Sequence, residues 1–133
     1  MTKIKDEKIA EVKEDFSAKK AEMTKEMNAK VDKIMADAQK QADLAKAKAV
    51  KLADDARDSA YKEADRQVAK VKNPLQKIAA KEAAKLAKKQ ADKAHTNAVA
   101  RADKQHANLM KKAQTRADKE RATYQAKIDK LGN

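Results

Sequence analysis

The chain has 133 residues and carries 33 Lys and Arg against 21 Asp and Glu, which gives a formal net charge of +12. It has one Gly, one Pro, no Cys, no Trp and three aromatic residues, so it lacks the material for a disulfide framework, a thiolate metal site or a sheet with tight turns. Charged residues make up 41% of the chain and alanine supplies most of the hydrophobic 41%, which is typical of long helices and coiled coils.

Apolar residues in the first half recur in steps of three and four, which is the spacing of one face of an α-helix. Two rows of this face repeat every eleven residues, and eleven residues make three helical turns. The spacing therefore predicts a helix over about residues 4–72 with one apolar contact face. The face comprises Ile9, Val12, Phe16, Met23, Met27, Val31, Ile34, Ala38, Ala42, Ala45, Ala49, Ala53, Ala56, Ala60, Ala64, Val68 and Val71.

The pair Asn73-Pro74 interrupts this pattern and predicts a turn at about residues 73–74. Proline disfavours helical geometry in the residue before it and removes a backbone donor. Asparagine tolerates the left-handed conformation that often closes a helix, so we expect Asn73 to end the first helix in this way. The alternative is a single long helix that is kinked at Pro74 and packs in an oligomer.

A second apolar stripe follows the break and predicts a helix over about residues 75–131, with Gly132 as its C-terminal stop. The predicted fold is therefore one elongated all-α domain, residues 1–133. It is a two-helix antiparallel coiled-coil hairpin with an alanine-rich seam built on the eleven-residue repeat. The second stripe comprises Leu75, Ile78 or Ala79, Ala83, Ala87, Ala91, Ala94, Ala98, Ala102, Leu109, Ala113, Ala117, Tyr124, Ile128 and Leu131.

A hairpin that turns near Asn73-Pro74 would place residue i roughly opposite residue 147 − i. In this register large side chains meet small ones or meet at the open end, and the N-terminus projects past the C-terminus. The seam between them is mostly alanine on alanine, which removes little apolar area per residue. The predicted pairs are Phe16 with Leu131, Met23 with Tyr124, Ile34 with Ala113, Ala38 with Leu109 and Tyr61 with Leu86.

Two histidines, His95 and His106, each follow an aspartate by three residues, namely Asp92 and Asp103. The pattern resembles a duplicated metal or acid–base pair, but a zinc site needs three or four converging ligands. The two histidines lie about 16 Å apart along one helix, too far to share an ion. We therefore interpret the pairs as copies made with the repeat, and we expect no metal, no cofactor and no catalytic residue.

Basic residues cluster on the second helix and form the candidate anion-binding site. Residues 73–133 hold 15 Lys and Arg against 6 Asp and Glu, whereas residues 1–72 hold 18 against 15. Such patches attract the phosphates of nucleic acids or acidic lipids without sequence specificity. The candidate residues are Lys77, Lys81, Lys85, Lys88, Lys89, Lys93, Lys111, Lys112, Arg116, Lys119 and Arg121.

The Ala-Asp pairs at residues 42, 53 and 64 mark three consecutive units, QADLAKAKAVK, LADDARDSAYK and EADRQVAKVKN. These units resemble the repeats of group-three late-embryogenesis-abundant proteins, the peripheral-stalk b subunits of ATP synthases and the helical tails of bacterial envelope proteins. The first resemblance implies a stress protectant that is disordered when hydrated and helical on drying or on membranes. The break at Asn73-Pro74 departs from that uniform repeat and favours a folded hairpin.

We expect a non-enzymatic structural or interaction protein, because there is no glycine-rich phosphate loop and a two-helix hairpin offers no enclosed pocket for a small-molecule substrate. The expected partner is another protein or a second copy of this chain, with the turn region (residues 72–76) or the open end as the contact point. A non-specific binder of nucleic acid or of an anionic membrane surface is the alternative. The absence of a signal-peptide-like or membrane-spanning stretch leads us to expect a cytoplasmic location.

Overall fold

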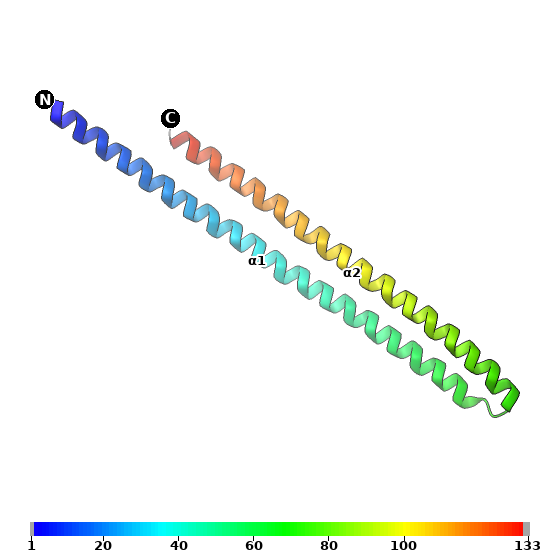
Figure 1. Ribbon diagram of the computed structural model, residues 1–133. Coiled ribbons are helices and arrows are strands. Elements are labelled where there is room, and N and C mark those ends of the chain that lie inside the picture. The colour runs from blue at the N-terminus through cyan, green and yellow to red at the C-terminus, as the bar shows by residue number, and fades with distance from the viewer. Residues whose placement is uncertain (1, 132–133) are drawn as a thin grey trace. The chain divides into compact units, whose positions relative to one another are not determined.

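The structure is a computed structural model that describes the backbone of residues 2–131 and the side chains of residues 15–131. It consists of two helices, α1 (Thr2–Lys70) and α2 (Pro74–Leu131), which pack against each other (Figure 1). No strand occurs in residues 2–131, so the predicted all-α helical hairpin is confirmed. The predicted N-terminal overhang, the seam positions Ile9 and Val12 and the helix stop Gly132 lie outside what the structure describes.

The side chain and backbone of Asn73 organise the start of α2. Its Oδ1 atom accepts hydrogen bonds from the backbone N–H groups of Leu75 at 2.9 Å and Gln76 at 3.4 Å. Its carbonyl oxygen accepts the first helical bond, from the N–H of Lys77 at 2.8 Å. Asn73 is thus an N-cap, which satisfies N–H groups that have no partner inside the helix.

The prediction that Asn73 closes the first helix in a left-handed conformation is wrong. No described non-glycine residue has a positive φ angle, and α1 ends earlier than predicted, at Lys70. Pro74 is the first residue of α2, where its fixed φ angle suits the helix and its missing N–H would have had no partner. The chain therefore reverses over residues 71–73.

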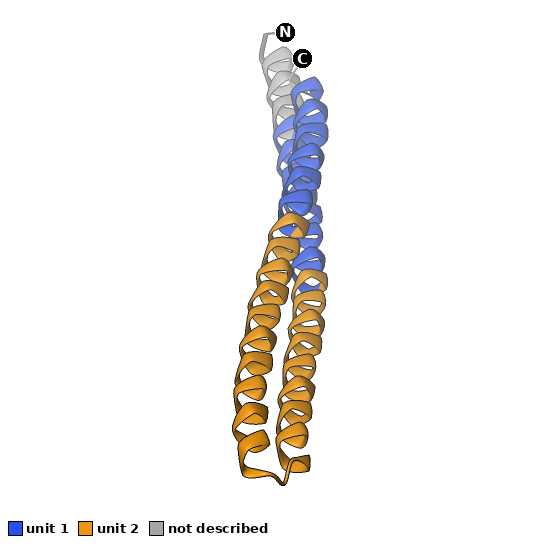
Figure 2. Ribbon diagram, turned by 90° about the vertical axis from the view of Figure 1, so that its right-hand side faces the viewer, with its two compact units in different colours: residues 1–40, 110–133 blue, residues 41–109 orange. Residues whose placement is uncertain are grey.

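The hairpin divides into two compact units, each of which pairs a segment of α1 with a segment of α2 (Figure 2). Unit 1 comprises residues 1–40 and 110–133, and unit 2 comprises residues 41–109. In unit 2, the contacting residues run in opposite order along the two helices, because Asp43 contacts His106 while Asp65 contacts Lys88. The two segments of unit 2 are therefore antiparallel.

The core is a thin seam in which buried residues lie eleven positions apart. In α1 the series is Val31, Ala42, Ala53 and Ala64, and each is at most 8% exposed. Since most of these side chains are alanine, the helices approach closely but gain little apolar burial per turn. In α2 the buried residues form two such series, which are Ala102, Ala113 and Tyr124, and Ala117 and Ile128.

One predicted row of the α1 seam is wrong in its second half, since its members Met23 and Ile34 are partly buried but the next two are not. Ala45 and Ala56 are exposed, and the positions one residue later, Lys46 and Arg57, are partly buried instead. Long basic side chains can lay their aliphatic stems along an apolar seam while their charged ends reach polar partners. Alanine occurs on several faces of α1, so the apolar pattern alone did not distinguish this face from its neighbour.

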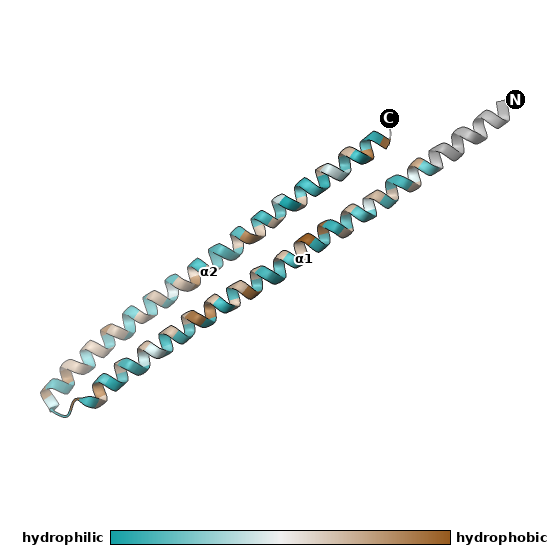
Figure 3. Cartoon of the chain, turned by 180° about the vertical axis from the view of Figure 1, so that it is seen from behind, coloured by the Kyte–Doolittle hydropathy of each residue, from teal (hydrophilic) through white to brown (hydrophobic). Residues whose placement is uncertain are grey.

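The first turns of the α2 stripe are also placed differently from the prediction. Leu75 is 78% exposed and Ile78 is 63% exposed, and the predicted alternative Ala79 is exposed as well. Figure 3 shows the corresponding mixture of hydrophilic and hydrophobic residues around both helices. The predicted seam positions Ala83, Ala87 and Ala94 are exposed, and the partly buried ones are Ala80, Ala84, Lys88, Ala91, His95, Ala98 and Val99.

Candidate functional site

A series of polar contacts joins α1 to α2 along unit 2, and we refer to it as the polar ladder. Each contact pairs an aspartate on one helix with a donor on the other, and all lie within hydrogen-bonding distance. The members are Asp43 Oδ1 with His106 Nε2 (2.8 Å), Lys46 Nζ with Asp103 Oδ1 (2.8 Å), Asp54 Oδ1 with His95 Nε2 (2.5 Å), Tyr61 Oη with Asp92 Oδ1 (2.6 Å), and Asp65 Oδ1 with Lys88 Nζ (2.7 Å).

The imidazole of His95 is held from two sides. A carboxylate can only accept, so the Nε2–H group of His95 donates to Asp54. The opposite ring nitrogen, Nδ1, lies 3.5 Å from Nη1 of Arg57, which can donate to it when the ring is neutral. The side chain of His95 is only 17% exposed, so these contacts are partly shielded from water.

The polar ladder follows the repeat of the sequence. Asp43 and Asp54 are eleven residues apart on α1, and His106 and His95 are eleven residues apart on α2. Because eleven residues correspond to three full turns, both pairs recur on the same side of the two helices. The repeat therefore produces two equivalent His–Asp contacts across the hairpin.

Neither histidine contacts the aspartate three residues before it in the pairs noted in the sequence. Asp92 accepts the hydroxyl of Tyr61, and Asp103 pairs with Lys46, so both carboxylates bind residues of α1. His95 and His106 bind other aspartates across the hairpin. The four residues act between the helices, which sequence reasoning missed because it matched only apolar side chains across the hairpin.

The contacts of the polar ladder shift two pKa values. The hydrogen bond to the Asp103 carboxylate raises the pKa of Lys46, because it stabilises the charged ammonium. The hydrogen bond to Asp92, helped by partial burial, raises the pKa of the Tyr61 phenol, because it stabilises the protonated form. The Lys88 ammonium also lies 5.3 Å from the centre of the Tyr61 ring.

Unit 1 also contains contacts between lysine and tyrosine side chains, around the buried Tyr124. The Lys30 ammonium lies 5.2 Å from the centre of its ring, and Lys127 lies 5.3 Å from it. A hydrogen bond to Tyr124 raises the pKa of Lys30, and Lys30 also lies 3.9 Å from Glu120. In both units, long basic side chains thus lie against the tyrosine rings at the contact between the helices.

The polar ladder connects α1 and α2 through pairs of side chains. No group of three or more potential metal ligands occurs among the described residues. Three threonine hydroxyls are used inside the helices, since Thr24, Thr115 and Thr123 each donate to the carbonyl four residues earlier. The arrangement can orient side chains and hold two helices in register.

The structure divides the predicted anion-binding residues into three groups, according to the unit in which they lie and to whether they take part in the polar ladder. Lys88 belongs to the polar ladder, where Asp65 neutralises it. In unit 2, Lys77, Lys81, Lys85, Lys89 and Lys93 are exposed, and Lys85 lies 3.7 Å from Glu82. In unit 1, Lys111, Lys112, Arg116, Lys119 and Arg121 are exposed, and Arg121 lies 3.6 Å from Asp118.

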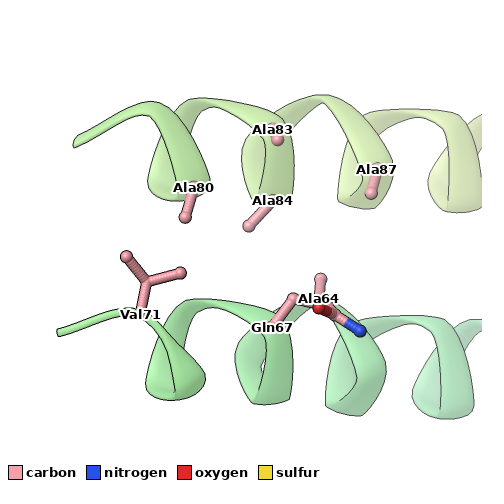
Figure 4. Close-up of a pocket in the computed structure, with 7 residues that line it drawn as sticks. All are labelled: Ala64, Gln67, Val71, Ala80, Ala83, Ala84 and Ala87. Carbon is pink, nitrogen blue, oxygen red and sulfur yellow. The ribbon is translucent and has the colours of Figure 1, made fainter. Parts of the chain in front are cut away.

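A shallow apolar groove of about 370 Å³ lies beside the turn in unit 2 (Figure 4). Val71 lies opposite Ala80, and Gln67 lies opposite Ala84. The side chains that line the groove are mostly the methyl groups of alanine. The groove was not predicted from the sequence, because three of its alanines had been assigned to the contact face between the helices. Its lining residues are Ala64, Gln67, Val71, Ala80, Ala83, Ala84 and Ala87.

Within the described residues, neither helix contains an apolar stretch long enough to cross a membrane. No protein-family model, curated protein or solved structure matches the chain.

Proposed function

We propose that the protein is a non-enzymatic helical arm that presents its outer faces to a protein partner or to a second copy of this chain. The polar ladder is the observation that carries this proposal. It supplies directional contacts along unit 2, where an alanine seam alone discriminates poorly between registers. A fixed register keeps the outward side chains in constant positions, as a binding arm requires.

The ladder penalises small slips of one helix against the other. Moving α2 by one turn would separate His95 from Asp54 and His106 from Asp43. Half-buried polar groups that lose their partners destabilise the shifted arrangement. The eleven-residue repeat on which the ladder is built thus acts as the device that sets the register of the arm.

The outer faces retain large apolar side chains that the partner helix does not cover. Leu44 is 60% exposed and Leu52 is 70% exposed on α1. Exposed apolar groups of this size are suited to packing against a further helix. They support a role in association rather than a role as an isolated spacer.

The proposal is tested by circular dichroism and multi-angle light scattering on the full chain over a range of concentrations. We expect a strongly helical protein with a cooperative melt, and association that weakens when Leu44 and Leu52 are replaced by Ser. Little helix in dilute buffer would contradict the arm. That outcome would favour the resemblance to late-embryogenesis-abundant proteins and a role as a desiccation protectant.

A further inference from the structure

The part of α2 nearest the turn exposes large apolar side chains to solvent. Leu75, Ile78 and Leu86 are 78%, 63% and 59% exposed. They are spaced by three and eight residues, which places them on one side of the helix, away from the partly buried Ala80 and Ala84. This side of α2 therefore carries large apolar side chains that α1 does not cover.

Lysines accompany these apolar side chains at every fourth position, namely Lys77, Lys81, Lys85, Lys89 and Lys93, and all five are exposed. Residues 70–93 contain eight lysines and two acidic residues, Glu82 and Asp92. Asp92 is engaged by Tyr61 and Glu82 lies near Lys85, while the charge of Lys88 is met by Asp65. The segment keeps a large excess of positive charge.

We propose that this surface, the closed-end face (Leu75, Ile78 and Leu86 with Lys77, Lys81, Lys85, Lys89 and Lys93), docks on a membrane surface that carries acidic phospholipid headgroups. Exposed Leu and Ile side chains enter the boundary between headgroups and acyl chains, and lysines extend their ammonium groups to the phosphates. The apolar side chains and the lysines both occur on the same turns of α2. The inference stands apart from the proposed arm, which does not depend on it.

The composition of the closed-end face favours lipid over nucleic acid. Residues 70–93 contain no arginine and no aromatic residue, so they offer neither bidentate phosphate contacts nor stacking with bases. Exposed Leu and Ile have no matching site on a phosphate backbone, whereas a bilayer accepts them. A second copy of this chain is also disfavoured as the occupant, because two such lysine-rich faces repel each other.

The second basic cluster of α2 provides a matched control. Lys111, Lys112 and Arg116 are exposed and basic, as the lysines of the closed-end face are. None of the described exposed large apolar residues lies between residues 110 and 131. Among the described residues, the exposed large apolar side chain that flanks this cluster is Leu109, at 41% exposed, so the cluster has similar positive charge with a much smaller apolar component.

The test is sedimentation of the full chain with vesicles of pure phosphatidylcholine and with vesicles that contain 30% phosphatidylserine, repeated at low and high salt. We expect binding to the acidic vesicles only, weakened by salt. The triple change Lys77→Gln, Lys81→Gln and Lys85→Gln should weaken this binding on the order of 100-fold. The triple change Leu75→Ser, Ile78→Ser and Leu86→Ser should weaken it at least about tenfold, with the helix content retained by circular dichroism.

The control variant Lys111→Gln, Lys112→Gln and Arg116→Gln removes the same number of charges and should retain most of the binding. Equal loss in the control and in the lysine variant would overturn the proposal, because it would indicate attraction by net charge alone. Unchanged vesicle binding after the three serine substitutions would also overturn it. Equal affinity for a DNA duplex, or a change of oligomeric state without vesicle binding, would assign the face to a different occupant.

Discussion

His95 donates through Nε2 to Asp54 across the two helices at 2.5 Å, and the same contact recurs one repeat away between His106 and Asp43. A sequence repeat that runs along each helix is thereby converted into a set of contacts between the helices. The alanines of the seam allow close approach, and the polar side chains determine which turn lies opposite which. The seam alanines thus permit close packing, while the polar side chains fix the register and also add to the stability.

Replacing His95 by Ala, or Asp54 by Ala, should each destabilise the hairpin by about 1 kcal/mol, since each removes a half-buried hydrogen bond. In the double variant the two losses should not add, and the coupling energy should be about 0.5 kcal/mol or more. Denaturant titrations followed by circular dichroism measure all three values. Asp55→Ala, at the exposed neighbouring position, should change the stability by less than about 0.5 kcal/mol. Additive losses would show that the pair does not interact in solution.

Replacing Asn73 by Ala should destabilise the hairpin by about 1 kcal/mol, because the N–H groups of Leu75 and Gln76 lose their cap. Asn73→Asp should retain the stability, because its carboxylate accepts the same bonds and favours the positive end of the helix. Thermal melts of the three proteins make the comparison. Equal melting temperatures for the Ala and Asn proteins would argue against the cap.

Ala53→Leu should destabilise the protein by about 1–3 kcal/mol, because Ala53 is 8% exposed and a larger side chain forces the helices apart. Ala94 belongs to the seam in the sequence prediction but is exposed in the structure. Ala94→Leu is therefore the matched control and should be nearly neutral. Comparable destabilisation by both changes in chemical denaturation would favour the predicted seam, which contains both alanines, over the observed one.

The hairpin should lose stability as the pH rises above about 10. Asp103 raises the pKa of Lys46 above its ordinary 10.5, and Asp92 raises the pKa of Tyr61 above its ordinary 10.0. A raised pKa means that the folded state holds the proton more tightly, so this stabilisation is complete below the unfolded-state value and disappears as the pH passes the folded-state value.

Unfolding titrations at pH 8 and pH 11 test this loss, and Tyr61→Phe should reduce it. In a Tyr124→Phe background, the absorbance titration of tyrosinate should report a pKa for Tyr61 above 10.0. A titration midpoint at or below that value would contradict the hydrogen bond to Asp92.

The helices and the break between them could be predicted from the sequence, because their signals are local. Steps of three and four mark the helical faces, and Pro74 marks the reversal. The buried series Val31, Ala42, Ala53 and Ala64 was likewise part of the predicted stripe. These features depend on spacing along one helix and on the backbone chemistry of proline.

The register could not be predicted, because it depends on contacts between residues that are distant in the sequence. The rule 147 − i places Asp54 opposite Lys93 and Asp43 opposite Lys104, whereas the structure pairs them with histidines two residues further along α2. The predicted register was chosen by matching large apolar side chains with small ones. Because alanine occurs on several faces of both helices, this matching does not distinguish one register from the next.

The predicted pair of Tyr61 with Leu86 fails for the same reason. Tyr61 contacts Lys88 and Asp92 rather than Leu86, which is 59% exposed. The matched spacing of Asp43 and Asp54 with His95 and His106 was the available signal for the true register.

Ring-proton contacts in solution test the register most directly, because the chain has only two histidines and two tyrosines and their signals are easily assigned. In a nuclear Overhauser experiment on isotope-labelled protein, we expect cross-peaks from the His95 ring to the Arg57 side chain and from the Tyr61 ring to the Lys88 side chain. Cross-peaks from the Tyr61 ring to the methyl groups of Leu86, without those to Lys88, would contradict the polar ladder.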